Sequence, residues 1–335
     1  MRIKREHLLI TARNTVAERT RYNSRVVSVY LTGSLLGEDF LLGGAGDIDL
    51  FFVHDEPIDP GREVVAVNED IHLDIANLPL RIFQQPRSLR VDPWIGPFFC
   101  LNPISLHDTQ HWFEFTQASL CSQFNRPENV LQRARSQAET ARQGWMSLHS
   151  STAWGAEKVL AYIKSIEKAA NAIALLSGAP LTERRFLLQF GQRANAIRRP
   201  GMVSGLMDLL TPGTPIPANA LSEWIPAWTH TLQAVGKLQR PPQRLSACRQ
   251  NYYTRAVEAQ MNDFPEAALW VMLRTWALAA CSLSTDVEIS SGWNRVCEAL
   301  YLDVEHVEER LTALDSYLDT VEEILDAQAK SQGLT

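Results

Sequence analysis

The chain lacks the features that mark several large protein classes. Its 5 cysteines among 335 residues show no paired spacing, which predicts neither a zinc knuckle nor a disulfide framework. No hydrophobic run approaches the roughly 20 apolar residues that a membrane-spanning helix needs. The charged N-terminus also has no apolar signal core. We therefore expect no membrane partner and a location in a reducing cytoplasm.

An excess of positive charge is also missing, since the formal net charge is −6 at pH 7. General affinity for nucleic acid comes chiefly from lysine and arginine side chains that neutralise phosphates. The composition therefore argues against nucleic acid as a general partner, although local basic clusters leave an RNA acceptor open.

Two common catalytic motifs are absent. The glycine-rich stretch 43–46 is not followed by Lys-Ser or Lys-Thr, so it is not the phosphate loop of the common NTPases. No Gly-x-Ser-x-Gly elbow occurs either. These absences argue against a common P-loop NTPase and against a hydrolase with a nucleophile elbow.

What the sequence does contain is a pair of acids at the start of an apolar strand. In the predicted strand 48–53 the apolar side chains alternate on one face, which leaves Asp47 and Asp49 together on the other. Two carboxylates this close repel one another, and a divalent cation is the obvious relief. The spacing therefore predicts a metal-binding pair.

A third acid is predicted on the same small sheet. Segments 63–67 and 71–76 alternate as strands and are separated by Asn-Glu-Asp, a composition typical of a hairpin turn. The second of these strands places its apolar residues on the core face and His72 and Asp74 on the opposite one. Three carboxylates then share an open sheet face.

This pattern resembles the nucleotidyltransferase superfamily typified by DNA polymerase beta, whose small members include antibiotic adenylyltransferases and the minimal nucleotidyltransferases of toxin–antitoxin pairs. The elements that carry the resemblance are Gly33-Ser34, the linker 35–46, Asp47-Ile48-Asp49, Asp74, and a later strand 104–108 that ends in Asp108. The resemblance covers roughly residues 5–125. It implies an α+β fold in which a small mixed-sheet nucleotidyltransferase domain is followed by an all-α helical region.

The resemblance also implies roles for these residues. Asp47, Asp49 and Asp74 would be the catalytic acids and would hold Mg²⁺ in a two-metal site. Asp74 would also help to take the acceptor proton. Gly33 and Ser34 would bind the phosphates of the nucleotide, with ATP as the substrate.

After residue 125 the composition favours helices. We predict a catalytic domain at 1–125, a helical domain that completes the cleft at 126–240, and a C-terminal helical bundle at 241–335. Lys158 and Lys164, on a predicted helix over 156–176, are candidate nucleotide-binding residues because ammonium groups suit phosphates. A solvated helix face is the alternative for both.

Three further features of the sequence leave alternatives open. The basic stretch from Arg184 to Arg199 is either a grip for phosphates or RNA, or an ordinary charged helix face. The aromatic residues of loop 94–99 either stack on a nucleobase or fill the core. A heptad seam over 304–325 packs within the chain or forms a homodimer.

The predicted activity is Mg²⁺-dependent transfer of AMP from ATP to a hydroxyl of a small-molecule acceptor, with release of pyrophosphate. An aminoglycoside-like antibiotic is the first acceptor to consider. The alternatives are nucleotidyl transfer to protein or RNA, of the toxin–antitoxin or second-messenger type, and an inactive nucleotide-binding module.

Overall fold

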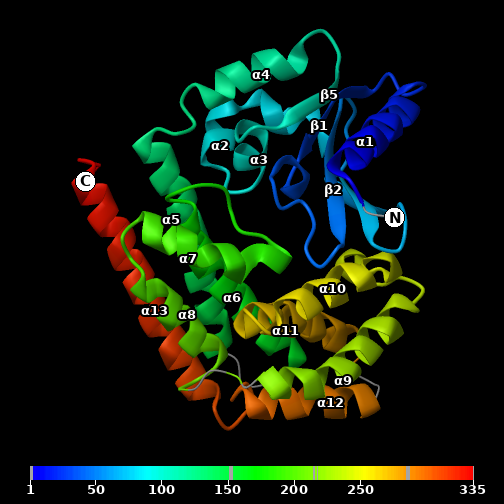
Figure 1. The fold of residues 1–335 in the computed structure, drawn as a ribbon. Coiled ribbons are helices and arrows are strands. Elements are labelled where there is room, and N and C mark those ends of the chain that lie inside the picture. The colour runs from blue at the N-terminus through cyan, green and yellow to red at the C-terminus, as the bar shows by residue number, and fades with distance from the viewer. Residues whose placement is uncertain (1–2, 151–153, 214–215, 217, 284–286, 335) are drawn as a thin grey trace. The chain divides into compact units, whose positions relative to one another are not determined.

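The computed structural model describes residues 3–150, 154–213, 216, 218–283 and 287–334. The chain forms two compact units (Figure 1). The first unit is Met1–Asn129 with Cys248–Arg255, and the second is Val130–Ala247 with Ala256–Thr335. The domain borders that we predict after residues 125 and 240 stay predictions. None of the helices in the described part of the chain combines the length and apolar character needed to cross a bilayer.

The first unit is a mixed sheet with helices, which confirms the α+β prediction. Its strands are β1 (Val26–Thr32), β2 (Gly46–His54), β3 (Gly61–Ala66), β4 (Ile71–Pro79) and β5 (Ile104–Asp108). Its helices and 3-10 turns are α1 (Arg5–Thr20), η1 (Ser34–Leu36), η2 (Leu80–Gln84), α2 (Pro86–Val91), α3 (Ile95–Cys100), α4 (Trp112–Cys121), η5 (Ala247–Arg249) and the first part of α10 (Gln250–Gln260).

The sheet has five strands in the order β3-β4-β2-β1-β5. β2 and β4 run parallel, whereas the β1–β2, β1–β5 and β3–β4 pairs are antiparallel. The predicted hairpin is the β3–β4 pair. Its turn is closed by Asn68, whose Oδ1 accepts hydrogen bonds from the backbone N–H groups of Asp70 and Ile71, both at 2.9 Å. The strands predicted from alternation are confirmed.

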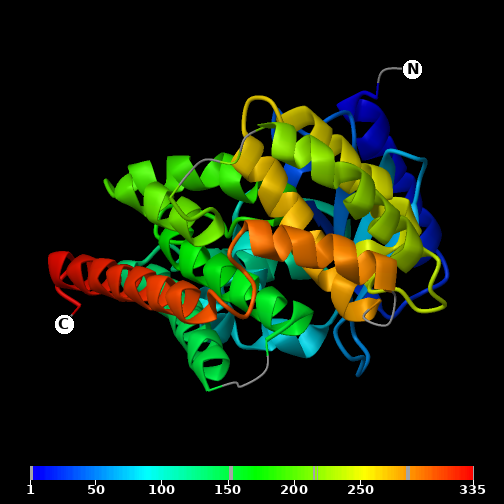
Figure 2. The same cartoon turned by 90° about the horizontal axis from the view of Figure 1, so that it is seen from below.

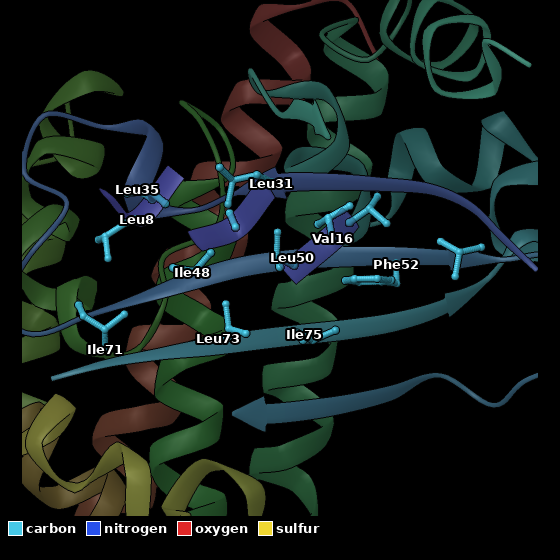
Figure 3. Close-up of a cluster of buried hydrophobic side chains, with 13 residues drawn as sticks. Leu8, Val16, Leu31, Leu35, Ile48, Leu50, Phe52, Ile71, Leu73 and Ile75 are labelled. Carbon is cyan, nitrogen blue, oxygen red and sulfur yellow. The ribbon is translucent and has the colours of Figure 1, made fainter. Parts of the chain in front are cut away.

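Helix α1 covers one face of this sheet, and α2, α3 and α4 pack on the other (Figure 1). Figure 3 shows the side chains between α1 and the sheet, which include Leu8 and Val16 from α1 and Ile48, Leu50 and Ile75 from the central strands. These residues are buried, and their burial fixes the register because a one-residue slip would turn every apolar side chain to the opposite face.

An aromatic cluster fills one half of the sheet face that lies opposite α1. The Tyr30 ring stacks on Phe51 at 4.9 Å between centroids, and the edge-on ring of Phe99 lies 5.2 Å away. Phe99 is fully buried, which supports the core alternative for this member of loop 94–99. Trp94 and Phe98 are half-buried. Asp47, Asp49 and Asp74 lie on the other half of this face.

One expectation about cysteine is wrong. Cys100 at the end of α3 and Cys121 at the end of α4 form a disulfide, with their Cα atoms 5.5 Å apart. The two residues are separated by 21 positions, and it is the packing of α3 against α4 that brings them together. Spacing along the sequence alone carries no signal for such a pair.

The second unit is helical. Its elements are the remainder of α5 (Pro127–His149), α6 (Ala156–Ala174), η3 (Glu183–Arg185), α7 (Phe186–Ala196), α8 (Gly201–Leu210), α9 (Ala218–Gly236), η4 (Gln243–Leu245), the end of α10, α11 (Pro265–Ser282), α12 (Val287–Ala299) and α13 (Val307–Ser331). Pro127 and Pro265 each stand at the first position of a helix, where the missing N–H has no intrahelical partner to lose. Helix α11 packs against α6 and α9, and its Trp270 and Trp276 are buried.

The heptad seam lies on α13. Leu311, Leu314, Leu318, Val321 and Leu325 are buried, and the helix packs along α6 and α8 (Figure 2). Val304, the first residue of the predicted seam, precedes the helix and is exposed. Within the second unit the seam therefore packs against helices of the same chain, as the intramolecular alternative predicts. A homodimer through this helix stays a prediction.

Candidate active site

The parallel pairing of β2 and β4 builds the site. In this register Asp47 lies beside His72, and Asp49 lies beside Asp74. The apolar residues that alternate with these four along β2 and β4 are buried under α1. Asp47, Asp49, His72 and Asp74 therefore share the opposite face of the sheet. Of the sequence-predicted residues, the structure thus brings the three acids together.

The acids are largely withdrawn from solvent. Asp47 is 9% exposed and Asp74 is 3% exposed, whereas the Asp49 side chain retains 20% exposure. Burial raises the pKa of Asp49 well above its usual range, and the charges of Asp47 and Asp74 raise it further. Arg62 and Arg249 act in the opposite direction without cancelling the effect.

The turn after β1 lies directly on Asp49. Gly33 has φ +82° and ψ −162°, a conformation open essentially to glycine alone. A Cβ at this position would overlap Oδ2 of Asp49. Glycine therefore serves two needs here: the backbone angle and the close approach of the turn to the carboxylate. The predicted partner Ser34 opens η1, and its hydroxyl donates to the Phe40 carbonyl at 3.4 Å.

Arg5 anchors the same turn from helix α1. Its Nε donates to the Leu35 carbonyl and its Nη2 to the Leu36 carbonyl, both at 2.8 Å. The guanidinium group thus holds two consecutive carbonyls of η1 in one planar fork. This contact fixes the position of the backbone that follows Gly33.

We expect an Arg5→Gln variant to loosen this turn. Hydrogen bonds from a charged donor contribute about 1.5 to 3 kcal/mol each, so the variant should lose on the order of 2 kcal/mol of stability. Because the resemblance implies that Gly33 and Ser34 bind the phosphates, we also expect the variant to bind nucleotide severalfold more weakly. Chemical denaturation and nucleotide titration measure the two effects. Arg13→Gln, at an exposed position on the same helix, is the matched control and should change neither.

Two arginines contact the third acid. Arg62, on β3, donates through Nε to Asp74 Oδ1, and its Nη2 lies 3.9 Å from Asp49 Oδ1. Arg249 places Nη1 3.5 Å from Asp74 Oδ2. Arg62 is 44% exposed, whereas Arg249 is 2% exposed. The guanidinium groups balance part of the negative charge of the acids.

A tyrosine from the same distant segment contacts the first acid. Tyr252 donates its hydroxyl to Asp47 Oδ2 at 2.7 Å, and its ring meets the His72 ring edge-on at 4.7 Å. The Arg249 guanidinium lies over the Tyr252 ring, 4.8 Å from its centroid. Gly43 lets the linker approach this helix, since a Cβ there would overlap the Arg255 carbonyl oxygen. Segment 248–255 is therefore part of the site.

No family model matches the sequence, and no curated protein matches it. Among solved structures, the chain is similar to a nucleotidyltransferase-like protein from Exiguobacterium sibiricum 255-15. The similarity has a TM-score of 0.33 and 11% sequence identity, and it covers 93% of this chain and 90% of that chain. A similarity this weak carries no argument about function. The function is therefore inferred from the geometry of the site.

The other sequence-predicted candidates lie in the second unit. Lys158 and Lys164 are on α6, half-buried and exposed respectively, and their nucleotide-binding role stays a prediction. The basic stretch from Arg184 to Arg199 begins in η3, continues through α7 and ends before α8. In this stretch Arg184 is 3% exposed, and Arg193 donates to the Ser177 carbonyl at 3.1 Å.

The sequence indicates no role for four residues that lie at the site: Arg62, His72, Arg249 and Tyr252. Alternation in the predicted strand 71–76 does place His72 on the correct face. Arg62 also had a usable signal, because alternation in the predicted hairpin puts it on the face of Asp74. Arg249 and Tyr252 are more than 170 residues from the acids that they contact and had no such signal.

The three carboxylates fit a divalent cation. Carboxylate oxygens are the ligands that Mg²⁺ takes in proteins, and three carboxylates on one face are costly without a cation to balance them. One atom each from Asp47, His72 and Asp74 lie within 4.8 Å of one another. Asp49 lies at the more exposed edge of this group.

Metal binding at these acids is expected to release protons. A carboxyl whose pKa is raised in the folded protein holds its proton more tightly than in the unfolded chain. The ionised Asp49 thus costs stability in full above that folded-state pKa. The cost decreases as the pH falls through this pKa and is gone below the pKa of the unfolded chain. Because a metal needs the ionised form, affinity should rise with pH. Calorimetry in two buffers of different ionisation enthalpy counts the protons, and wild type should release more than Asp49→Asn. Equal release would contradict the shift.

Proposed function

We propose that this protein is a metal-dependent nucleotidyltransferase that transfers AMP from ATP to a hydroxyl of a small-molecule acceptor. The observation that carries the proposal is the convergence of Asp47, Asp49 and Asp74 on one sheet face, with the glycine turn at Gly33 held against Asp49. The glycine turn lets the backbone approach a phosphate chain closely, and the paired acids beside it bind the cations that neutralise the phosphates.

In the proposed site Asp47, Asp49 and Asp74 would hold a divalent metal ion. When bound, the metal supplies positive charge to the triphosphate and to the departing pyrophosphate. The backbone at Gly33-Ser34 presents an N–H and a hydroxyl to a phosphate oxygen. Arg62, half-exposed beside Asp49 and Asp74, is placed to turn its guanidinium to a phosphate as well.

The proposed reaction balances without a further reagent. The acceptor hydroxyl oxygen forms a bond to the α-phosphorus, and the bond from that phosphorus to the bridging oxygen breaks. Pyrophosphate leaves with the bonding electrons, and the hydroxyl proton passes to a carboxylate of the acid cluster. Arg62 and Arg249 contact the two oxygens of Asp74, and the role of Asp74 as the proton acceptor stays a prediction.

Two observations favour a small acceptor over RNA. The net charge of the chain is −6, which opposes binding to a polyanion. The stretch from Arg184 to Arg199 does not offer its arginines as one exposed surface, since Arg184 is buried and Arg193 is committed to a backbone carbonyl. Arg198 and Arg199 line a groove of about 880 Å³ between α8 and α13, beside Asp208 and Glu323.

Transfer of label from α-³²P-ATP tests the proposal. The protein is incubated in Mg²⁺ with pooled small molecules, tRNA or cell protein, and a parallel reaction contains γ-³²P-ATP. We expect α-label, but no γ-label, in the small-molecule fraction. Label in tRNA or protein would favour the alternative acceptors. Label from γ-³²P-ATP would identify a kinase and contradict nucleotidyl transfer.

A further inference from the structure

We infer that His72 is a metal ligand, so that the site binds a divalent transition-metal ion in preference to Mg²⁺. The inference rests on the proposed function because it uses the same acids, and it adds a nitrogen to an otherwise all-oxygen ligand set. The resemblance assigns roles to three carboxylates and none to this histidine.

The backbone places His72 among the acids. It lies next to Asp47 across the parallel β2–β4 pair and two residues before Asp74 on β4. Its side chain is fully buried. A ring nitrogen of His72 and one carboxylate oxygen each from Asp47 and Asp74 lie within 4.8 Å of one another. Ligand atoms on one cation are at most about 4.2 Å apart, because each bond is about 2.1 Å, so small side-chain rotations complete the set.

The surrounding contacts orient this set. Tyr252 donates its hydroxyl to Asp47 Oδ2 at 2.7 Å, which holds this carboxylate in position beside His72. The Tyr252 ring also packs edge-on against the imidazole and limits its rotation. Groups of this kind, which hold ligands in position, typically change metal affinity by about 10- to 100-fold when they are removed.

The chemistry of the imidazole sets the preference. Mg²⁺ is a hard ion that keeps oxygen ligands and several waters, and it gains little from an imidazole nitrogen. Divalent transition-metal ions accept an imidazole ligand, and affinity for a given site rises from Mn²⁺ through Fe²⁺, Co²⁺ and Ni²⁺ to Cu²⁺ and falls again at Zn²⁺. Two carboxylates and one histidine therefore favour a transition metal, with Asp49 at the exposed edge available to a second ion or to the nucleotide's own cation.

The competing account makes His72 an imidazolium that balances the charge of Asp47 and Asp74. The same geometry would then serve an ion pair, and metal would bind through oxygen alone. The two accounts differ in one observable, which is a bond from the metal to nitrogen.

Electron spin-echo measurements on Mn²⁺-loaded protein read that bond directly. The full chain is stripped with a chelator and loaded with Mn²⁺, a paramagnetic member of the series. We expect modulation from a directly bound nitrogen in wild type, and a change from the ¹⁴N to the ¹⁵N pattern when the protein carries ¹⁵N-histidine. His72→Gln should remove the modulation and weaken Mn²⁺ binding by about tenfold or more, with a much smaller effect on Mg²⁺.

The control and the contradicting results separate this inference from the proposed function. His54→Gln makes the same change on β2, at a residue bound to Asn77 Oδ1, and should keep the modulation. Mn²⁺ bound without nitrogen modulation in wild type would overturn the inference and leave the nucleotidyltransferase proposal standing. Persistence of the modulation in a folded His72→Gln or His72→Asn protein would also overturn it. Failure of wild type to bind either metal would overturn both.

Discussion

An Asp49→Asn variant is expected to lose nucleotidyl transfer by at least about a thousandfold, which corresponds to about 4 kcal/mol of transition-state stabilisation. The side chain keeps its size but loses the charge that a cation and a triphosphate need. Because the ionised Asp49 is repelled by Asp47 and Asp74, the variant should be as stable as wild type or more stable. Initial rates and thermal melts measure the two effects.

Asp55→Asn is the matched control for this variant. Asp55 directly follows β2 and is exposed, so the same substitution there should leave both rate and stability unchanged. A folded Asp49→Asn protein with wild-type turnover would remove Asp49 from the chemistry.

A Gly33→Ala variant is expected to lose transfer by about a hundredfold or more, since displacement of a reacting group by about 1 Å has an effect of this size. The added methyl group would overlap Asp49 Oδ2, so either the turn or the carboxylate has to move. The unfavourable backbone conformation adds about 1 to 3 kcal/mol to the loss of stability. Turnover and chemical denaturation report the two effects separately.

Gly44→Ala controls for the backbone conformation alone. Gly44 also has a positive φ, at +84°, but a Cβ there would meet nothing within 4 Å. This variant should lose some stability and keep its turnover. If Gly33→Ala and Gly44→Ala lost equal activity, the contact with Asp49 would not be the cause.

Much of the first unit follows from local pattern in the sequence. Alternation in 48–53 and 71–76 predicts which side chains face the core, and it therefore also places Asp49 and Asp74 on one face. The turn at Asn68 is likewise readable from residue types, whereas the strand that ends in Asp108 is implied by the family resemblance. These features depend on residues near one another in the chain, which is why one sequence suffices for them.

The remainder of the site depends on tertiary packing. Tyr252 reaches Asp47 across 205 positions, and Arg249 reaches Asp74 across 175. No periodicity within segment 248–255 indicates that it belongs with a distant sheet. The Cys100–Cys121 disulfide has the same origin, because it requires the packing of α3 against α4. The heptad seam shows the converse, since its spacing predicts a buried stripe but not which helices cover it.

The central claim is that the acid face binds a nucleoside triphosphate through a divalent metal. Binding of a non-hydrolysable α,β-methylene analogue of ATP tests it most directly, because no acceptor is needed. We predict that calorimetry detects binding to wild type only in the presence of Mg²⁺ or Mn²⁺, and that Asp49→Asn abolishes it while Asp55→Asn does not. Binding that is equally tight without metal, or equally tight in Asp49→Asn, would contradict the account.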